Sequence, residues 1–276
     1  MQQNLVSIIM AAYNAERYIE QAIGSVQAQS YAQWELLVVD DGSQDATASI
    51  VERLAQGDRR IRLFRQANKG VSAARNVALA AMRGEFFLIF DSDDVLPSES
   101  LRLRVEKMRE NAAIWFVDGW VSQKNDQLNE RIRWRKPDFR GSPHEALMRL
   151  DMRCFSVPSW LVRREKGAPY AMREGMSHAE DLLFYIDISR DKMRLYDYVE
   201  EKVLIYRIHD NMAMRKLDGL ERGYIQLFKI LKSEFNISWG TRCFLRYKIM
   251  RIMFLSYLRQ RQWGKALRSL WRTLVM

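Results

Sequence analysis

The first hundred residues alternate between short apolar runs and stretches of helical periodicity. The apolar runs, each of strand length, lie at residues 5–10, 34–39, 61–64 and 86–90. After the first run, apolar residues between Ile19 and Val26 recur at the spacing of one helix face. Strands that alternate with helices in this way are typical of a mostly parallel sheet flanked by helices. The pattern therefore predicts an α/β fold of the Rossmann-like type.

The pattern is less regular beyond Pro97. It predicts a helix to about residue 111, a strand at 114–121, polar loops after it, a helix that starts near Ala179, and a strand at 202–206. We interpret residues 1–215 as one enzyme domain. Its nucleotide-binding half covers about 1–110 and its acceptor half about 111–215.

Acidic residues follow two of the predicted strands at the point where each strand ends. The second strand runs into Asp40-Asp41-Gly42-Ser43, and the fourth runs into Asp91-Ser92-Asp93-Asp94. Open α/β sheets bind their ligands just outside the carboxyl ends of the strands. Carboxylate oxygens are also the ligands that Mg²⁺ and Mn²⁺ prefer. The sequence therefore predicts a ligand and cation site at this edge of the sheet.

These segments belong to a longer series of motifs. In chain order they are VSII leading to Tyr13-Asn14, LVVDDGS at 37–43, NKGVSAARN at 68–76, DSDD at 91–94, Glu180-Asp181, and YRIH at 206–209. In this order and spacing the chain resembles the family 2 glycosyltransferases, an inverting group with the A-type glycosyltransferase (GT-A) fold, over roughly residues 5–210. The resemblance implies transfer of a sugar from a nucleotide-sugar donor, expected to be a UDP sugar, to an acceptor hydroxyl.

The resemblance assigns the donor and metal roles to the turn after the fourth strand. It implies that Asp91 and Asp93 meet Mn²⁺ or Mg²⁺ and the donor, with Asp93 as the direct ligand and Ser92 in the same donor-binding turn. Asp94 is expected to support the turn. Departure of a nucleoside diphosphate develops negative charge, which a cation held by carboxylates neutralises. A D-x-D at a strand end can also be a solvated loop, but the flanking motifs favour the site.

The nucleotide pocket is expected around the first two strand ends. The resemblance places the base of the nucleotide against Asp40, with Tyr13, Asn14 and the backbone near Ala12 completing the pocket. A buried carboxylate such as Asp40 needs a hydrogen-bond partner. The alternative is that Asp40 or Asp41 simply caps a turn with Gly42 and Ser43, and for Asp41 this role stays fully open.

Arg75 follows Gly70-Val71-Ser72 on a predicted helix. A guanidinium there could donate a forked pair of hydrogen bonds to the diphosphate. A solvated helical arginine is the alternative.

Attack by an acceptor hydroxyl also needs a base. The resemblance maps the E-D motif of the family onto Glu180 and Asp181, with Asp181 as general base and Glu180 in contact with the acceptor. Both could instead be ordinary carboxylates in the first turn of a helix. It also places His209 as a third metal contact or near the diphosphate, although a lone histidine is often structural.

The net charge of +10 lies entirely in the last part of the chain. Residues 216–276 hold thirteen Lys or Arg and three Asp or Glu, and their pattern predicts basic amphipathic helices without a spanning segment. The apolar face expected for the last of these helices contains Trp263, Ala266, Leu267, Leu270, Trp271 and Leu274. We expect this helical appendage to lie on a membrane surface and to bind no nucleic acid. Packing of its apolar face on the enzyme's own core is the alternative.

Other classes of protein lack support in the sequence. No G-x-G-x-x-G follows the first strand, and glycoside hydrolases do not need the D-x-D and Asp40 pattern. A catalytically inactive scaffold that binds anionic membrane or nucleic acid through the basic tail remains the rival interpretation. The two cysteines lack metal-ligand spacing, and no secretory signal precedes the first strand. We expect a cytoplasmic enzyme, peripheral on the inner face of the cytoplasmic membrane. Its acceptor is expected to be a lipid-linked or cell-surface glycan of polysaccharide or lipopolysaccharide biosynthesis.

Overall fold

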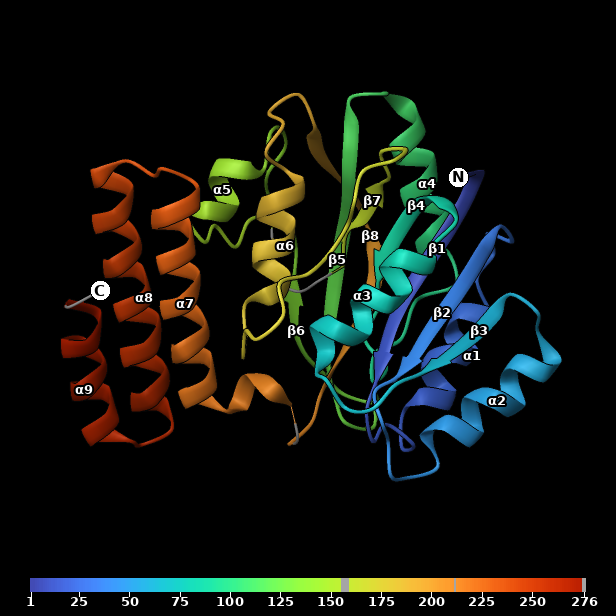
Figure 1. Cartoon of the computed structure of the whole chain (residues 1–276), viewed down its shortest axis with the longest axis horizontal. Coiled ribbons are helices and arrows are strands. Elements are labelled where there is room, and N and C mark those ends of the chain that lie inside the picture. The colour runs from blue at the N-terminus through green and yellow to red at the C-terminus, as the bar shows by residue number, and fades with distance from the viewer. Residues whose placement is uncertain (155–158, 211, 275–276) are drawn as a thin grey trace.

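The computed structural model describes residues 1–154, 159–210 and 212–274. They form one sheet with helices on both faces and a block of three helices at one side (Figure 1). In chain order the elements are β1 (Gln2–Ala12), α1 (Ile19–Gln27), β2 (Trp34–Asp40), α2 (Thr47–Gly57), β3 (Ile61–Arg65), α3 (Val71–Ala81), β4 (Gly84–Ile89), α4 (Ser100–Glu110), β5 (Ile114–Asn125), β6 (Arg131–Arg135), α5 (His144–Met148), β7 (Leu161–Arg163), α6 (Glu180–Ile188), β8 (Leu195–Ile208), η1 (Ala213–Arg215), α7 (Leu217–Glu234), α8 (Trp239–Arg259) and α9 (Trp263–Leu274).

The strand order confirms the predicted α/β architecture. It also shows that the second half of the sheet contains both parallel and antiparallel strands. Within the described residues the order is β3-β2-β1-β4-β7-β5-β6, and β8 pairs with β5. The first four strands along the chain are mutually parallel, as is the β5–β8 pair, whereas β6 and β7 run antiparallel to their neighbours. The expectation of polar loops was wrong for β6, and β7 was not predicted. Since β5 and β8 run in the direction of β4, their carboxyl ends reach the edge at which β1, β2 and β4 end.

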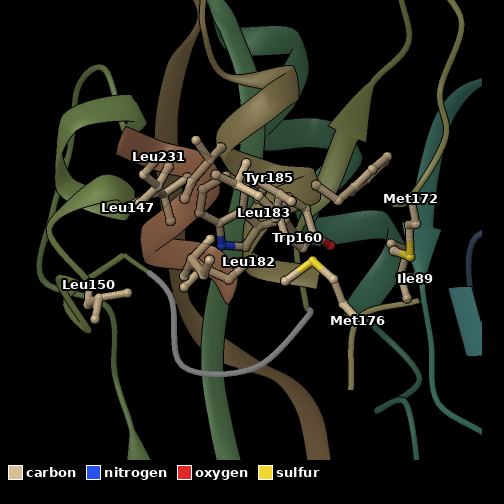
Figure 2. Packing of buried hydrophobic residues seen from close by; sticks show 14 of the residues in the cluster. Ile89, Leu147, Leu150, Trp160, Met172, Met176, Leu182, Leu183, Tyr185 and Leu231 are labelled. Carbon is tan, nitrogen blue, oxygen red and sulfur yellow. The ribbon is translucent and has the colours of Figure 1, made fainter. Parts of the chain in front are cut away.

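Alternating side chains along the central strands build two cores. Ile8 and Leu88 belong to the cluster on the face covered by α1 and α4, and Ile9 and Ile89 belong to the cluster on the opposite face. Each of these side chains is at least 99% buried. The second core extends through Trp160, Leu183 and Tyr185 to residues of α5 and α7 (Figure 2). This packing fixes the helix that carries Glu180 and Asp181 against the sheet.

The three C-terminal helices stand side by side, with α9 farthest from the sheet (Figure 1). Leu227, Leu231 and Ile249 of α7 and α8 are buried in the same core as the sheet. For α7 and α8, the alternative prediction is therefore correct: their apolar faces pack on the core of the enzyme. The division at residue 215 stays a prediction. Among the described residues, no helix is long and apolar enough to span a bilayer.

Candidate active site

The carboxylates that follow β4 form a tight group. One carboxylate oxygen from each of Asp91, Asp93 and Asp94 lies within 4.8 Å of the others. Asp94 is buried, and burial followed by the charges of Asp93 and Asp91 raises its pKa well above the usual range. Burial and the charge of Asp91 also raise the pKa of Asp93. Oxygen donors gathered at this density repel one another, and a hard divalent cation would relieve the repulsion. The donor set therefore fits Mg²⁺ or Mn²⁺.

The end of β8 holds this acidic turn in place. The backbone N–H of Arg207 donates to Asp94 at 2.8 Å, and its buried guanidinium donates to the carbonyl oxygen of Asp93 at 2.7 Å. His209 contacts the carboxylate of Asp93, with 2.9 Å between Nε2 and Oδ2. His209 thus lies at the predicted metal turn, bound to a carboxylate. Arg207 is a positioning residue. It belongs to the YRIH motif, but no role was predicted for it from the sequence.

Arg75 links the two halves of the site. Its guanidinium is buried, lies 2.6 Å from Asp91 and 3.5 Å from Glu180, and is therefore not the solvated helical arginine considered above. Burial opposes the charged form, but the charges of Asp91, Glu180 and Asp181 outweigh it and raise the pKa of Arg75. The turn after β4 and the start of α6 thus meet at one arginine. The geometry brings together the carboxylates that the sequence placed about ninety residues apart.

The carboxyl of Asp181 has a raised pKa. Burial, and next the charge of Glu180, raise its pKa to about 7, although Arg75 acts in the opposite direction. One carboxylate oxygen accepts from the N–H of Leu182 at 2.6 Å. The helix begins after Ala179, which has a left-handed φ of 63° that is uncommon for a residue with a side chain. A pKa near the working pH suits general base catalysis.

Two neighbouring aspartates at the end of β2 have different surroundings. Asp40 is buried and accepts from the N–H of Ser43 at 3.2 Å. Asp41 accepts from the N–H groups of Lys69 and Gly70, both at 2.8 Å, just before α3. Asp41 therefore anchors the loop that leads to Arg75, rather than capping its own turn with Gly42 and Ser43.

The predicted pocket residues after β1 have different surroundings, because Tyr13 is exposed to solvent and Asn14 is hydrogen-bonded to a neighbouring loop. Tyr13 is 51% exposed at this edge of the sheet and can stack on a base. The side chain of Asn14 accepts from the N–H of Gln44 at 2.9 Å, and its own N–H donates to Ser43. Asn14 thus joins the loop after β1 to the loop after β2. Ala12 is buried, and its carbonyl accepts from Asp41.

Helix α7 also packs closely against the residues just before α6. A Cβ atom placed on Gly223 would lie 2.5 Å from the carbonyl oxygen of His178, two residues before Glu180. Gly223→Ala is therefore expected to destabilise the fold by about 1–3 kcal/mol, because backbone must move. Thermal unfolding measures this. Gly264→Ala in α9, where a Cβ meets nothing within 4 Å, is the control and is expected to leave the unfolding temperature equal or higher. Equal unfolding temperatures for the two variants would contradict the close-packing argument.

Comparison with known proteins decides the family. The family model of glycosyl transferase family 2 matches residues 7–184. The chain belongs to glycosyltransferase family 2. The chain is 45% identical over 193 residues to the Escherichia coli protein named UDP-Glc:alpha-D-GlcNAc-diphosphoundecaprenol beta-1,3-glucosyltransferase WfgD, which covers 69% of this chain and 72% of that protein. Against three other bacterial glycosyltransferases, the alignments cover 62%, 81% and 94% of the relatives' lengths.

Solved structures of similar fold confirm the predicted GT-A fold. Staphylococcus aureus TarS 1–349 in complex with UDP-GlcNAc matches with a TM-score of 0.68 at 20% identity, over 98% of this chain and 81% of that chain. The mannosyltransferase PcManGT from Pyrobaculum calidifontis, in complex with GDP-Man and Mn²⁺, matches with a TM-score of 0.63 at 17% identity, over 98% and 75%. The chain is thus a glycosyltransferase, and nothing in these comparisons supports the interpretation as an inactive scaffold.

Proposed function

We propose that this glycosyltransferase moves a sugar from a UDP sugar to an acceptor hydroxyl with inversion at the anomeric carbon. The observation that carries the proposal is the junction at Arg75, which joins Asp91 of the acidic turn to Glu180, the neighbour of Asp181. The leaving diphosphate and the attacking hydroxyl must meet at one sugar. The junction places a group for each of them within reach of the same arginine.

Direct displacement assisted by one base, Asp181, would invert the configuration at the anomeric carbon. Asp181, with a pKa of about 7, takes the proton of the acceptor hydroxyl as that oxygen forms its bond to the anomeric carbon. The bond from the anomeric carbon to the diphosphate oxygen breaks in the same displacement, on the opposite face of the sugar. Glu180 contacts the acceptor. Direct displacement of this kind inverts the configuration.

We assign Asp93 and Asp91 as the residues that hold Mn²⁺ or Mg²⁺, with His209 beside them. The cation supplies charge neutralisation for the departing diphosphate. Asp40 and Tyr13 hold the base of the nucleotide, supported by Asn14 and the backbone of Ala12, while Ser92 lies in the donor-binding turn. Arg75 stabilises the diphosphate once the donor is bound. The complex of the structural neighbour TarS with UDP-GlcNAc supports the choice of a UDP sugar as donor.

The acceptor we propose is a sugar linked through a diphosphate to a lipid, within surface polysaccharide assembly. The relative WfgD, by its name, uses a GlcNAc-diphosphoundecaprenol acceptor. The test is a panel of nucleotide sugars, incubated with Mn²⁺ and a synthetic GlcNAc-diphospho-alkyl acceptor, with the product linkage read by NMR. Transfer from a UDP sugar with an inverted product is expected. A retained configuration, or transfer from other nucleotides alone, would overturn the corresponding part of the proposal.

Among the basic helices, we propose that α9 is the one that contacts the membrane. Trp263, Leu267 and Trp271 recur at every fourth residue and are 66%, 65% and 69% exposed, whereas Ala266 of the predicted apolar face is buried. The side chain of Leu274, which we placed on that face, lies outside the described residues. An exposed stripe with two tryptophans, next to cationic residues, fits the interface of an anionic bilayer.

Two ion pairs hold α9 against α7, so its apolar stripe faces outward from a fixed helix. Lys265 lies 2.6 Å from Asp218, and Arg272 lies 2.8 Å from the buried Glu221. A lipid-linked acceptor would approach from the same surface. We therefore propose that the enzyme works as a peripheral protein on the cytoplasmic face of the membrane.

Flotation with lipid vesicles tests this surface. Removing residues from Gly219 onward would delete α7 and its buried side chains, so substitutions on α9 are the sharper test. The wild type is expected to float with phosphatidylglycerol-rich vesicles and to stay behind with phosphatidylcholine. The triple variant Trp263→Ala, Leu267→Ala, Trp271→Ala is expected to lose flotation about tenfold or more, because apolar burial at the interface is removed. Met193→Ala, which removes an exposed apolar residue elsewhere, serves as the control. Undiminished flotation of the triple variant would show that α9 is not the contact.

A further inference from the structure

A cavity lined by cations lies in the acceptor half of the enzyme. Its volume is about 160 Å³, and it opens between the end of β6 and residues 152–154. The charged groups that line it are Arg133, Arg135, Lys136, Arg153 and Asp118. None of these has a role in the transfer derived above. The space is smaller than the roughly 300–1,000 Å³ typical of pockets for whole drug-sized ligands, so it suits one small group.

The positive charge of the cavity is not balanced by the protein. Among the described residues, no carboxylate pairs with Arg133, Arg135 or Lys136. Arg153 is paired with Asp151 at 2.7 Å. The Nε atom of Arg135 is buried and has no hydrogen-bond partner in the described part of the chain. Burial, and then the charge of Arg133, lower the pKa of Arg135. Cations that crowd together without a counter-charge indicate a site for an anion.

Asp118 is the exception among the lining residues. It is buried on β5, where the hydroxyl of Ser159 donates to it at 2.7 Å. Burial raises its pKa to about 6, in spite of the hydrogen bond from Ser159. Its single charge is outnumbered by the unpaired cations. The cavity therefore keeps a net positive potential.

Aromatic side chains of the core connect α6, which carries Asp181, to residues beside the cavity. Tyr185 lies four residues after Asp181, on the same face of α6. Its ring centroid is 4.8 Å from that of Trp160, the residue after Ser159 (Figure 2). Burial, and then the charges of Asp181 and Asp118 among others, raise the pKa of Tyr185.

We propose that this cavity binds the diphosphate that links the acceptor sugar to its lipid. The inference rests on the proposed transfer to a diphosphate-linked acceptor and names the group that recognises it. Arginine guanidinium groups donate paired hydrogen bonds to phosphate oxygens, and the buried Nε of Arg135 has no hydrogen-bond partner among the described residues. The enzyme then selects acceptors by their anionic link as well as by their sugar.

Calorimetric titration of the full-length enzyme with inorganic diphosphate tests the cavity directly. EDTA removes metal, and saturating UDP occupies the donor site. The wild type is expected to bind one diphosphate under these conditions. Arg133→Ala with Lys136→Ala is expected to weaken that affinity at least about tenfold, since two charge-assisted contacts are lost. Arg131→Ala is the matched control, because Arg131 is exposed on the same strand and does not line the cavity. Absence of binding by the wild type, or equal affinity of the double variant, overturns the inference.

Two acceptors separate this inference from the proposed function. With a GlcNAc-diphospho-alkyl acceptor the double variant is expected to raise KM at least about tenfold and to leave kcat unchanged, which is the signature of lost binding that is uniform in ground and transition state. With the uncharged alkyl glycoside of the same sugar its KM is expected to equal that of the wild type. An equal increase in KM for both acceptors contradicts a diphosphate contact. Failure of the wild type to transfer sugar from any UDP sugar would overturn the proposed donor. The difference in diphosphate affinity between the wild type and the double variant would still report on the cavity, because both proteins have the same donor site.

Discussion

Replacing Asp181 by asparagine is expected to lower kcat by about a thousandfold while leaving donor binding intact. General base catalysis contributes about 10²–10⁴ in rate, and an amide cannot take the proton of the acceptor hydroxyl. The amide oxygen can still accept from the N–H of Leu182, so the start of α6 is kept. Steady-state transfer and UDP affinity are the two measurements. Asp187→Asn, on the same helix and paired with Arg190 at 2.7 Å, is the matched control.

The pH dependence of the wild type follows from the same carboxyl. Its pKa is raised to about 7, so the base is ionised above this pH and protonated below it. We expect kcat/KM to rise with pH to about 7 and then level off, and we expect Asp181→Asn to lose this rise. A profile that is flat from pH 5.5 to 8.5 would remove Asp181 as the base.

Stability provides an independent control on that variant. A carboxyl whose pKa is higher in the folded than in the unfolded protein favours folding when protonated, and this contribution is lost as the pH rises through about 7. At pH 8 the ionised Asp181 therefore costs stability, which asparagine does not. Asp181→Asn is expected to unfold at the same temperature as the wild type or above it. Low activity without loss of stability would then be chemical in origin.

The sequence predicted the donor half well because its signals are local there. Strands such as 34–39 are apolar except at Glu35, as expected for parallel strands buried on both faces, and each ends in a polar turn. The order of such strands in the sheet was not needed to place Asp40 and Asp91 at one edge. Parallel strands bring their carboxyl ends together whatever their order.

The acceptor half was harder to predict because its elements depend on distant partners. β6 has the sequence Arg-Ile-Arg-Trp-Arg, whose alternation indicates a strand, but its charges resemble those of a loop. β7 has only three residues and forms because β4 and β5 lie on either side of it. The left-handed Ala179 before α6 and the close approach of Gly223 to His178 are fixed by tertiary packing. No local pattern indicates that Arg75 would bridge the two halves.

Replacing Asp93 by asparagine is expected to abolish metal-dependent transfer, with kcat lowered by about 10²–10³ or more. Removal of one preorganised electrostatic contact to a developing negative charge typically costs this much. The substitution removes one of three grouped carboxylates and the partner of His209. Affinity for Mn²⁺, measured by calorimetry in the presence of UDP, is expected to fall at least about tenfold, in step with the loss of a charged oxygen ligand.

The control for this variant is Asp210→Asn. Asp210 follows His209, and its side chain is 92% exposed, so its loss removes a nearby charge without touching the group. Wild-type enzyme treated with EDTA should behave as Asp93→Asn does, and added Mn²⁺ should restore the former but not the latter. If Asp93→Asn instead kept its Mn²⁺ affinity and its transfer rate, the cation would have to lie elsewhere. The convergence of Asp91, Arg75 and Glu180 would then serve to orient the helix that carries the base.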